Sequence, residues 1–517
     1  MPATGTPERH ATTSTPTEPT VADAPERHVH VAIVGSGFAG LGMAIRLKQQ
    51  GMHDFVVLER ADDVGGTWRD NHYPGCQCDV PSHLYSFSFA PNPAWSRTFS
   101  RQPEIQTYLR RCADEHGVMP HMRFGHGVTG AAWDDAAQVW RLDTAGGSFT
   151  ARLLVAAPGA LSEPSVPSIP GIERFEGTVF HSADWDHDHD LDGERVAVIG
   201  TGASAIQFVP QIQPRVDRLH LFQRTPAWIM PHPDRPISRL ERRVYRAFPA
   251  AQRLMRAGLY WARETFVFGF LHRRLMRLPQ RIARRHLRSQ VADPKLRAKL
   301  TPDYEIGCKR ILISNDFYPS LTKRNVEVVT DGVREVRASS IVDSEGVERE
   351  VDTIIFGTGF QVARMPIAER VRGRDGLLLA DAWRDGMQAH LGTTVAGFPN
   401  MFVIPGPNTG LGHTSMVFMI ESQIAYVLDC MRAMDASGVG AVDVRPEIQA
   451  AYNDEVQEHM EGTVWLSGCA SWYLDASGRN TTLWPGFTYD FRRRTSRFDP
   501  AHYELRAAVP APVPAAG

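Results

Sequence analysis

The chain has 517 residues, ordinary shares of apolar and charged residues, and a formal net charge of −2. This length requires more than one domain, and the near-neutral charge argues against nucleic acid as a general partner. Six scattered cysteines exclude a disulfide framework. One residue separates Cys76 from Cys78, so this pair does not form a C-x-x-C motif, and both are expected to be reduced structural thiols in a cytoplasmic protein.

Both ends of the chain have the composition of disordered tails. Residues 1–28 are rich in Thr, Pro, Ala and Glu and lack the apolar block of a signal peptide. Residues 506–517 are predicted to be a second tail. No membrane span is expected, because prolines and glycines interrupt the uncharged stretch 386–420 and the apolar run 265–272 is too short.

The first folded unit begins with a dinucleotide-binding pattern. Residues 28–34 predict a strand, Gly35-Ser-Gly37-Phe-Ala-Gly40 follows, and an amphipathic helix runs to about residue 50. A second strand, 55–58, ends at Glu59, whose carboxylate suits a ribose diol. The glycines let the backbone approach a pyrophosphate at the helix N-terminus. This context predicts an FAD-type site rather than a chance glycine turn.

A second dinucleotide-binding pattern follows. Residues 153–159 predict a strand that returns to the first sheet, and residues 195–199 begin a new unit at Gly200-Thr-Gly202-Ala-Ser-Ala205. Alanine is allowed at the third position because only a small residue is needed there. The next strand, 219–222, is followed by Arg224 instead of an acidic residue, which favours the 2′-phosphate of NADPH over a solvated surface role for this arginine.

An arginine-rich segment with helical periodicity covers residues 231–300. We expect a helical insertion whose aromatic stripe faces the core and whose arginines are solvated. A membrane-surface or lipid-substrate contact is the less favoured alternative.

The predicted architecture is α/β, with two Rossmann-like dinucleotide-binding domains. After residues 326–329, the strand 351–359 ends in small residues and marks the return from the second domain, which is therefore inserted in the first. The expected divisions are the tail 1–28, the first part of the FAD domain 29–160, the NADPH domain 161–355 with its helical insertion 231–300, the second part of the FAD domain 356–505, and the tail 506–517.

The segment between the two units carries a family fingerprint. Phe175, Gly177, His181, Trp185 and Asp186 match every fixed position of the pattern F-x-G-x-x-x-H-x-x-x-W-[PD]. The chain thereby resembles the type I Baeyer–Villiger monooxygenases, a branch of the class B flavoprotein monooxygenases. The resemblance extends over residues 29–503. Its further blocks are Gly65-Gly-Thr-Trp68, Tyr73-Pro-Gly75, Cys78-Asp79, Lys309-Arg310, Trp472-Tyr473, Gly478-Arg479 and Trp484-Pro-Gly486.

The resemblance implies FAD and NADPH as cofactors and a ketone and O2 as substrates. NADPH would reduce FAD, and a C4a-peroxyflavin would insert one oxygen atom next to the ketone carbonyl, giving an ester or a lactone. Because charge stabilisation in a dry site is a large catalytic effect, a fixed cation near the flavin would stabilise the anionic species. By resemblance Arg310 is this cation and Asp79 orients it, which would also offset the desolvation of Arg310. Bare sequence alone would make Asp79 a loop cap beside Pro81.

The resemblance also assigns individual binding roles. Lys309 would contact the 2′-phosphate, Met416 would lie near the far side of the flavin ring, and His181 would couple nicotinamide binding to domain motion. Trp484 would contact the nicotinamide ribose, although it could instead be a core anchor. The expected cofactor contacts are Gly35, Gly37, Phe38, Gly40, Glu59, Arg60, Gly66, Thr67, Trp68, Asp70, Tyr73, Asp79, Val128, Met416, Gly200, Thr201, Gly202, Ser204, Ala205, Gln207, Arg224, Thr225, Lys309 and Trp484.

Other functions receive less support from the sequence. A related flavin monooxygenase acting on sulfides or amines is the alternative, but such enzymes usually carry other residues at Trp185-Asp186. A flavin-dependent disulfide reductase needs a reactive cysteine pair, which Cys76 and Cys78 do not provide. The acidic run 184–192 is interpreted as a solvated loop, so no metal is expected. The assembly is expected to be a monomer or a homodimer.

Overall fold

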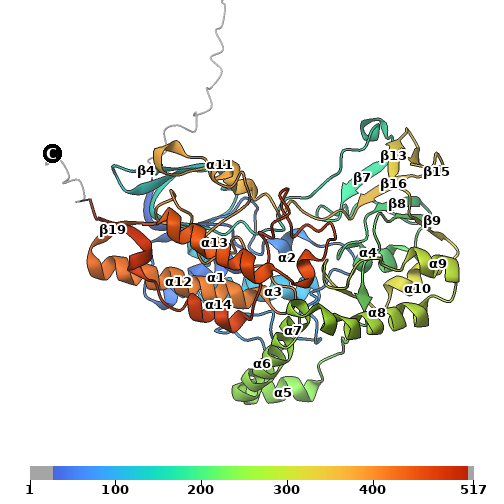
Figure 1. The fold of residues 1–517 in the computed structure, drawn as a ribbon, viewed down its shortest axis with the longest axis horizontal. Helices are drawn as coiled ribbons and strands as arrows, with labels where there is room; N and C mark the ends of the chain where they lie inside the picture. The colour runs from blue at the N-terminus through green and yellow to red at the C-terminus, as the bar shows by residue number, and fades with distance from the viewer. Residues whose placement is uncertain (1–26, 510–517) are drawn as a thin grey trace, which may run out of the picture.

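The structure is a computed structural model, and it describes residues 27–509. Figure 1 shows two lobes, each built around its own sheet, with a helical hairpin projecting away from both. Apart from residues 27–28 and 506–509, the two predicted tails lie outside the described residues.

The first lobe contains a mixed sheet built on the first glycine turn. Strand β1 (Arg27–Val34) pairs in parallel with β2 (Phe55–Leu58) on one side and with β6 (Gly147–Ala156) on the other. The predicted return of the chain to the first sheet at residues 153–159 is thus confirmed. The remaining strands are β3 (Met122–Arg123), β4 (Val128–Asp134), β5 (Val139–Thr144), β17 (Val371–Arg372) and β18 (Met401–Val403).

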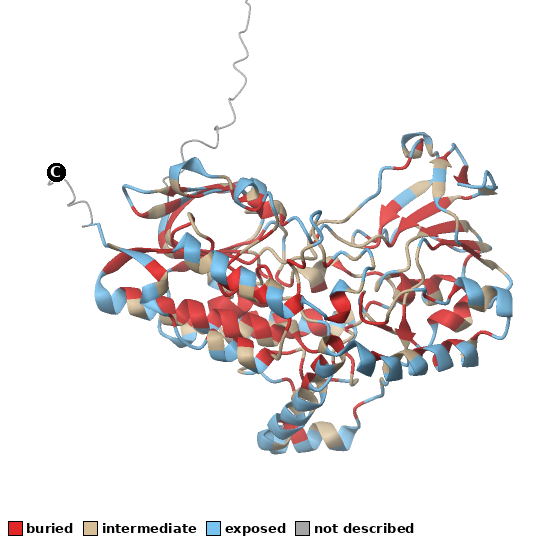
Figure 2. Cartoon of the chain, viewed as in Figure 1, coloured by how far each residue is buried: buried red, intermediate tan, exposed pale blue. Residues whose placement is uncertain are grey.

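Helices packed on this sheet supply most of the first lobe's core. Figure 2 shows that α1 (Phe38–Gln49) and α12 (Met416–Ser437) consist largely of buried residues. The other helices of this lobe are α2 (Thr67–Asp70), α3 (Gln102–Glu115), α11 (Leu379–Ala382), α13 (Pro446–Met460) and α14 (Thr488–Arg494). A two-stranded antiparallel sheet of β19 (Val439–Val444) and β20 (Tyr503–Ala507) lies near the C-terminal end.

The second lobe contains a parallel sheet built on the second glycine turn. Its strand order is β12 (Val326–Val329), β9 (Arg218–Phe222), β8 (Arg195–Ile199), β16 (Thr353–Phe356) and β7 (Thr178–His181). The helices α4 (Ala205–Ile212) and α10 (Phe317–Leu321) belong to this lobe, as do the short strands β10 (Ile229–Met230), β11 (Leu312–Ile313), β13 (Val333–Val336), β14 (Ser340–Asp343) and β15 (Glu348–Glu350).

The chain order confirms the predicted fold class. All strands of the second sheet follow β6 and precede β17 and β18, which return to the first sheet. The second dinucleotide-binding unit is therefore inserted in the first. The predicted domain boundaries themselves stay a prediction.

The helical insertion consists of α5 (Arg239–Ala247), α6 (Pro249–Glu264), α7 (Val267–Leu271), α8 (Arg277–Gln290) and α9 (Pro294–Lys299). We expected the aromatic residues of this insertion to face the core. That expectation is wrong for several of them, since Phe248, Trp261, Phe266 and Phe268 are exposed. Within residues 27–509, no helix combines the length and the apolar character needed to cross a bilayer.

The cysteines divide into two groups. Cys76, Cys78, Cys112 and Cys430 are free and buried, which confirms the expectation for the first two. Cys308 and Cys469 form a disulfide across 161 residues of sequence. Composition and spacing gave no indication of this cross-link, because its two halves come from segments that only the fold brings together.

Candidate active site

Two glycines of the first turn, Gly35 and Gly40, are packed so closely that no Cβ fits on them. A Cβ on Gly35 would lie 2.5 Å from the carbonyl oxygen of Ala157, and one on Gly40 would lie 1.9 Å from that of Gly35. Gly37 precedes α1 and provides no side-chain cap. The first amides of α1 are therefore free to bind a phosphate, as a pyrophosphate site requires.

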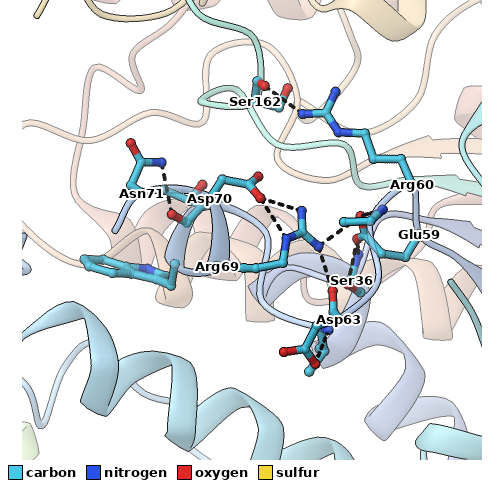
Figure 3. Close-up of polar contacts among 12 residues, drawn as sticks. Ser36, Glu59, Arg60, Asp63, Arg69, Asp70, Asn71 and Ser162 are labelled. Carbon is cyan, nitrogen blue, oxygen red and sulfur yellow. Dashed lines mark hydrogen bonds and ion pairs between the residues drawn. The ribbon is translucent and has the colours of Figure 1, made fainter. Parts of the chain in front are cut away.

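Glu59 holds this turn in place, as Figure 3 shows. Its Oε2 accepts hydrogen bonds from the amide and hydroxyl of Ser36 at 2.9 and 2.6 Å, and its Oε1 accepts one from the amide of Ala61 at 3.0 Å. Arg69 approaches Oε1 to 3.1 Å. Burial alone would raise the pKa of Glu59, but the Arg69 charge and these hydrogen bonds outweigh burial and hold the pKa below its usual value.

Arg69 is a site residue that the sequence analysis missed. Its guanidinium lies between Glu59 and Asp70 and also donates to the carbonyl oxygen of Asp63 at 2.6 Å (Figure 3). Asp70, a predicted cofactor contact, thus pairs with Arg69, which in turn pairs with Glu59. The position of Arg69 directly after the Gly65-Gly-Thr-Trp68 block is the sequence feature that could have pointed to it as a site residue.

The loop after Gly65 meets both lobes. Gly66 begins α2 with a φ of +53°, and its Cβ position would lie 3.0 Å from the Cα of Gly37, so Thr67 and Trp68 start beside the first turn. Further along, the Tyr73 hydroxyl donates to Gln207 Oε1 at 3.0 Å. Gln207 lies on α4, so this contact joins the first lobe to the second glycine turn.

The second glycine turn has the same close packing. A Cβ on Gly200 would lie 2.4 Å from the carbonyl oxygen of Gly357, and a Cβ on Gly357 would lie 3.1 Å from the side-chain Cβ of Ala205. Small residues at positions 205 and 357 are therefore required together. Ser204 precedes α4 without capping it through its side chain, so the helix amides beside Gly202 remain available to a phosphate.

Two basic residues converge at the end of β9. Arg224 is exposed just after this strand, and its positive charge contributes to lowering the pKa of Lys309, after burial. The ammonium of Lys309 lies 5.0 Å above the ring of Tyr304. Thr201 and Thr225 also meet here, with the Thr201 hydroxyl donating to the Thr225 carbonyl oxygen at 3.3 Å. Like charges held close together are typical of a site for a phosphate group.

Arg310, next to Lys309, is paired with Asp79. Its Nε and Nη2 donate to Asp79 Oδ2 at 3.1 and 2.5 Å. The Asp79 charge raises the pKa of Arg310. Burial alone would raise the pKa of Asp79, but the Arg310 charge and the hydrogen bonds to the carboxylate together outweigh burial and lower it. The Arg310 side chain is still 41 % exposed, and its Nη1 donates to no residue within 27–509. One edge of this guanidinium can therefore reach a bound molecule.

The surroundings of the pair come from three distant segments. Arg263, near the end of α6, adds positive charge that further lowers the pKa of Asp79. The buried Tyr473 lies close enough that the Arg310 charge partly offsets the burial that raises the pKa of this tyrosine to about 12. The Cys308–Cys469 disulfide ties the segment before Arg310 to the segment before Tyr473.

The fingerprint residues lie before, on and after β7, the edge strand of the second sheet. A Cβ on Gly177 would lie 2.1 Å from the Asp352 carbonyl oxygen, and Trp185 packs against Phe208 of α4 at a centroid distance of 5.2 Å. His181 is buried, which lowers its pKa. Its Nδ1 accepts from the amide of Ala183 at 3.0 Å, while the buried Nε2 has no hydrogen-bond partner among residues 27–509.

The other fingerprint positions have structural partners. Phe175 packs against the core of the second lobe. Asp186 accepts from the amides of Asp188 and His189 at 3.0 and 3.1 Å. The acidic run thus folds as a loop, and no group of three or more His, Cys, Asp or Glu residues in the described part of the chain is arranged to hold a metal ion.

Four predicted contacts lie further from the two turns. Val128 is the first residue of β4. Arg60 donates to the Ser162 carbonyl oxygen at 2.8 Å (Figure 3). Met416 is the first residue of α12. Trp484 is buried, and its indole N–H donates to the Phe487 carbonyl oxygen at 3.0 Å. This arrangement favours the core-anchor interpretation of Trp484.

A buried polar cluster that the sequence did not predict links the helical insertion to the first lobe. Glu264, at the end of α6, accepts hydrogen bonds from the amide and hydroxyl of Thr488 at 2.9 and 2.8 Å and from His413 Nε2 at 3.1 Å. His413 lies three residues before Met416. No local signal marks Glu264, since a single glutamate near a helix end is usually solvated.

Comparison with known proteins gives a consistent result. Residues 28–372 match the model of a family described as flavin-binding monooxygenase-like. The chain is 57 % identical over 489 residues to a Baeyer–Villiger monooxygenase of Streptomyces coelicolor, covering 94 % of each chain. It is 54 % identical to one of Pseudomonas aeruginosa, covering 95 % of this chain and 93 % of that one. A solved structure described as OTEMO in complex with FAD and NADP is 26 % identical, with a TM-score of 0.83, 92 % of this chain covered and 99 % of that one.

Proposed function

The chain belongs to the flavin-binding monooxygenase-like family and, within it, to the type I Baeyer–Villiger monooxygenases, and we propose that Arg310 is the fixed cation of its oxygen-insertion chemistry. The protein is an FAD- and NADPH-dependent enzyme that inserts one oxygen atom of O2 next to a ketone carbonyl, giving an ester or a lactone. The observation that carries the proposal is the Arg310–Asp79 pair, which stands beside Lys309 and has one free guanidinium edge.

The residues present fit FAD at the first glycine turn. Gly35 and Gly40 leave no room for a Cβ, and the uncapped N-terminus of α1 offers amides to the pyrophosphate. Glu59 is fixed at the end of β2, where a ribose is expected, and α2 with Thr67 and Trp68 would cover the ring. When bound, FAD takes electrons from NADPH and activates O2.

The residues present also fit NADPH at the second glycine turn. Gly200 and the uncapped start of α4 would receive its pyrophosphate. Arg224 and Lys309 would bind the 2′-phosphate, which NADH lacks. His181, with its buried Nε2 lacking a well-formed hydrogen bond, would sense the bound nucleotide from the edge strand β7.

The geometry of Arg310 explains how it would serve the reaction. Asp79 accepts from Nε and Nη2 and leaves Nη1 free, so Nη1 would donate to the oxygen on which negative charge develops. Because Asp79 raises the pKa of Arg310, the cation persists at any pH at which the protein is folded. Asp79 is thus a positioning residue, and Arg310 is the group that would contact the reacting atoms.

The test is an Arg310→Ala variant, with Arg310→Lys as the charge-conserving companion. Removing a preorganised donor typically costs 10²–10³-fold in rate, so we expect ester formation by Arg310→Ala to fall by about that factor. Binding of FAD and oxidation of NADPH should persist, because neither uses Nη1. Ester formation at the normal rate by Arg310→Ala would remove Arg310 from this role. A cytoplasmic location and a monomeric or dimeric state stay predictions.

A further inference from the structure

Helix α6 turns a row of four polar side chains towards the protein. Its buried residues are Gln252 and Glu264. The half-buried Arg256 and Tyr260 complete the same row, because each member lies four positions along the chain from the next. A surface helix of a globular protein normally has the opposite arrangement, with its apolar stripe on the core.

Specific hydrogen bonds fix this orientation of α6. Gln252 Nε2 donates to the Asn92 carbonyl oxygen at 2.7 Å, and Arg256 Nη1 donates to the carbonyl oxygens of His83 and Ser86 at 2.6 and 2.9 Å. At the other end of the helix, Glu264 accepts from Thr488, as described above. The helix therefore cannot turn its apolar side inward without losing its polar contacts.

The outward face of α6 and of its neighbour α5 carries large apolar side chains. We call α5 and α6 together, residues 239–264, the hairpin; Figure 1 shows it projecting from the body, and Figure 2 shows it largely exposed. Among the large apolar side chains of the hairpin, the highest exposed fractions are those of Leu254 (75 %), Leu240 (70 %), Phe248 (66 %) and Trp261 (58 %). Such a concentration of exposed apolar residues marks a contact surface.

The charge around this face is strongly positive. Residues 239–264 contain seven arginines and two glutamates, in a chain whose formal net charge is −2. Both glutamates are already engaged, Glu241 by Arg235 and Ser238 and Glu264 by its buried cluster. Arg243, Arg246 and Arg253 make no ion pair with any residue in the described part of the chain.

We propose that the hairpin docks on the surface of an anionic phospholipid bilayer. Apolar side chains flanked by arginines match such a surface, since the former enter the acyl boundary and the latter meet the phosphate groups. A second copy of the chain fits less well, because a two-fold interface places the same positive patch against itself. The proposal concerns a peripheral contact and goes beyond the oxygenase function.

The experiment is a vesicle flotation assay with the holoenzyme. We expect it to float with vesicles of phosphatidylcholine and phosphatidylglycerol, to remain behind with phosphatidylcholine alone, and to detach as salt is raised. Leu254→Ser with Trp261→Ser should lower the partition coefficient at least about tenfold. Arg243→Gln, Arg246→Gln and Arg253→Gln should each lower it about fivefold.

The controls separate lipid binding from other causes. Leu377→Ser with Leu505→Ser removes two exposed apolar side chains outside the hairpin and should leave flotation unchanged. The hairpin variants should retain NADPH-dependent ketone oxidation, and flotation does not depend on catalysis. A failure of the membrane proposal can therefore be distinguished from a failure of the proposed role of Arg310. Absence of flotation, flotation unaffected by Leu254→Ser with Trp261→Ser, or a solution dimer that this variant converts to monomer would overturn the proposal.

Discussion

Arg310 and Asp79 are separated by 231 residues of sequence, yet two guanidinium nitrogens of Arg310 converge on the same carboxylate oxygen, Asp79 Oδ2. This geometry directs the third nitrogen, Nη1, away from the pair. It also joins the loop that follows Cys78 to the segment that precedes β11. The position of Arg310 against the flavin-binding lobe therefore depends on one carboxylate.

Asp79→Asn should separate positioning from folding. An amide cannot hold two charged donors as firmly, so we expect ester formation to fall by about 10²-fold. The free energy of unfolding should fall by no more than about 1 kcal/mol, because the pair is partly exposed to solvent. Product analysis and thermal unfolding measure the two quantities.

A merely structural role for Asp79 predicts a different pattern. Stability and activity would then decline together, and FAD would be lost during purification. Asp79→Glu serves as the matched variant, because it retains the charge and should recover part of the activity. A fully active Asp79→Asn enzyme would contradict the positioning role.

Arg224→Ala and Lys309→Ala should change the choice of nicotinamide nucleotide. Charge-assisted hydrogen bonds contribute about 1.5–3 kcal/mol, so we expect KM for NADPH to rise roughly ten- to a hundredfold. KM for NADH should change little, because NADH has no 2′-phosphate. Steady-state kinetics with both nucleotides provide the measurement, and Arg218→Ala, on the same strand β9, is the control. Equal increases in KM for NADPH and for NADH would show that Arg224 and Lys309 do not bind the 2′-phosphate.

The sequence predicted those features whose signals are local. The strand, glycine turn, helix and acid from residue 28 to Glu59 are contiguous, and the structure reproduces them as β1, α1 and β2. The same holds for β8, its glycine turn and β9. Hydrophobic periodicity and small residues determine such elements within about thirty residues.

Features that depend on residues far apart in the sequence could not be predicted from such local patterns. Asp79 was predicted through resemblance alone, and the Cys308–Cys469 disulfide was not predicted. The apolar stripe of α6 showed that one face differs from the other, but periodicity does not tell which face meets the protein. That information lies in the partners of Gln252 and Glu264, which come from other parts of the chain.

The disulfide should stabilise the fold and the loop that carries Tyr473. Replacing Cys308 and Cys469 by serine should lower the free energy of unfolding by about 2–4 kcal/mol. Thermal unfolding of this variant and of the parent, each with and without reductant, measures the effect. Reductant should destabilise only the parent. Titration of thiols in denaturant should find the four free cysteines before reduction, and a larger number would show that the bond does not form.

Asp443 on β19 should make stability depend on pH. Burial raises its pKa to about 6, despite a hydrogen bond from the Gly397 amide at 3.0 Å and the nearby charge of Arg374. The folded protein therefore binds this proton more tightly than the unfolded chain, whose carboxyl has a pKa near 4. Stability should fall as pH rises from about 4 to about 6 and remain lower above that range.

Asp443→Asn tests this sign, because an amide keeps an acceptor for the Gly397 amide and carries no charge. Relative to the parent, the variant should gain up to about 3 kcal/mol at pH 7 and little below pH 4, since a shift of one pKa unit corresponds to 1.36 kcal/mol. Urea unfolding across this pH range measures the difference. Asp435→Asn, an exposed carboxylate at the end of α12, is the control and should show no such trend. A variant that is less stable than the parent at pH 7 would show that the ion pair with Arg374 outweighs the burial of the carboxylate.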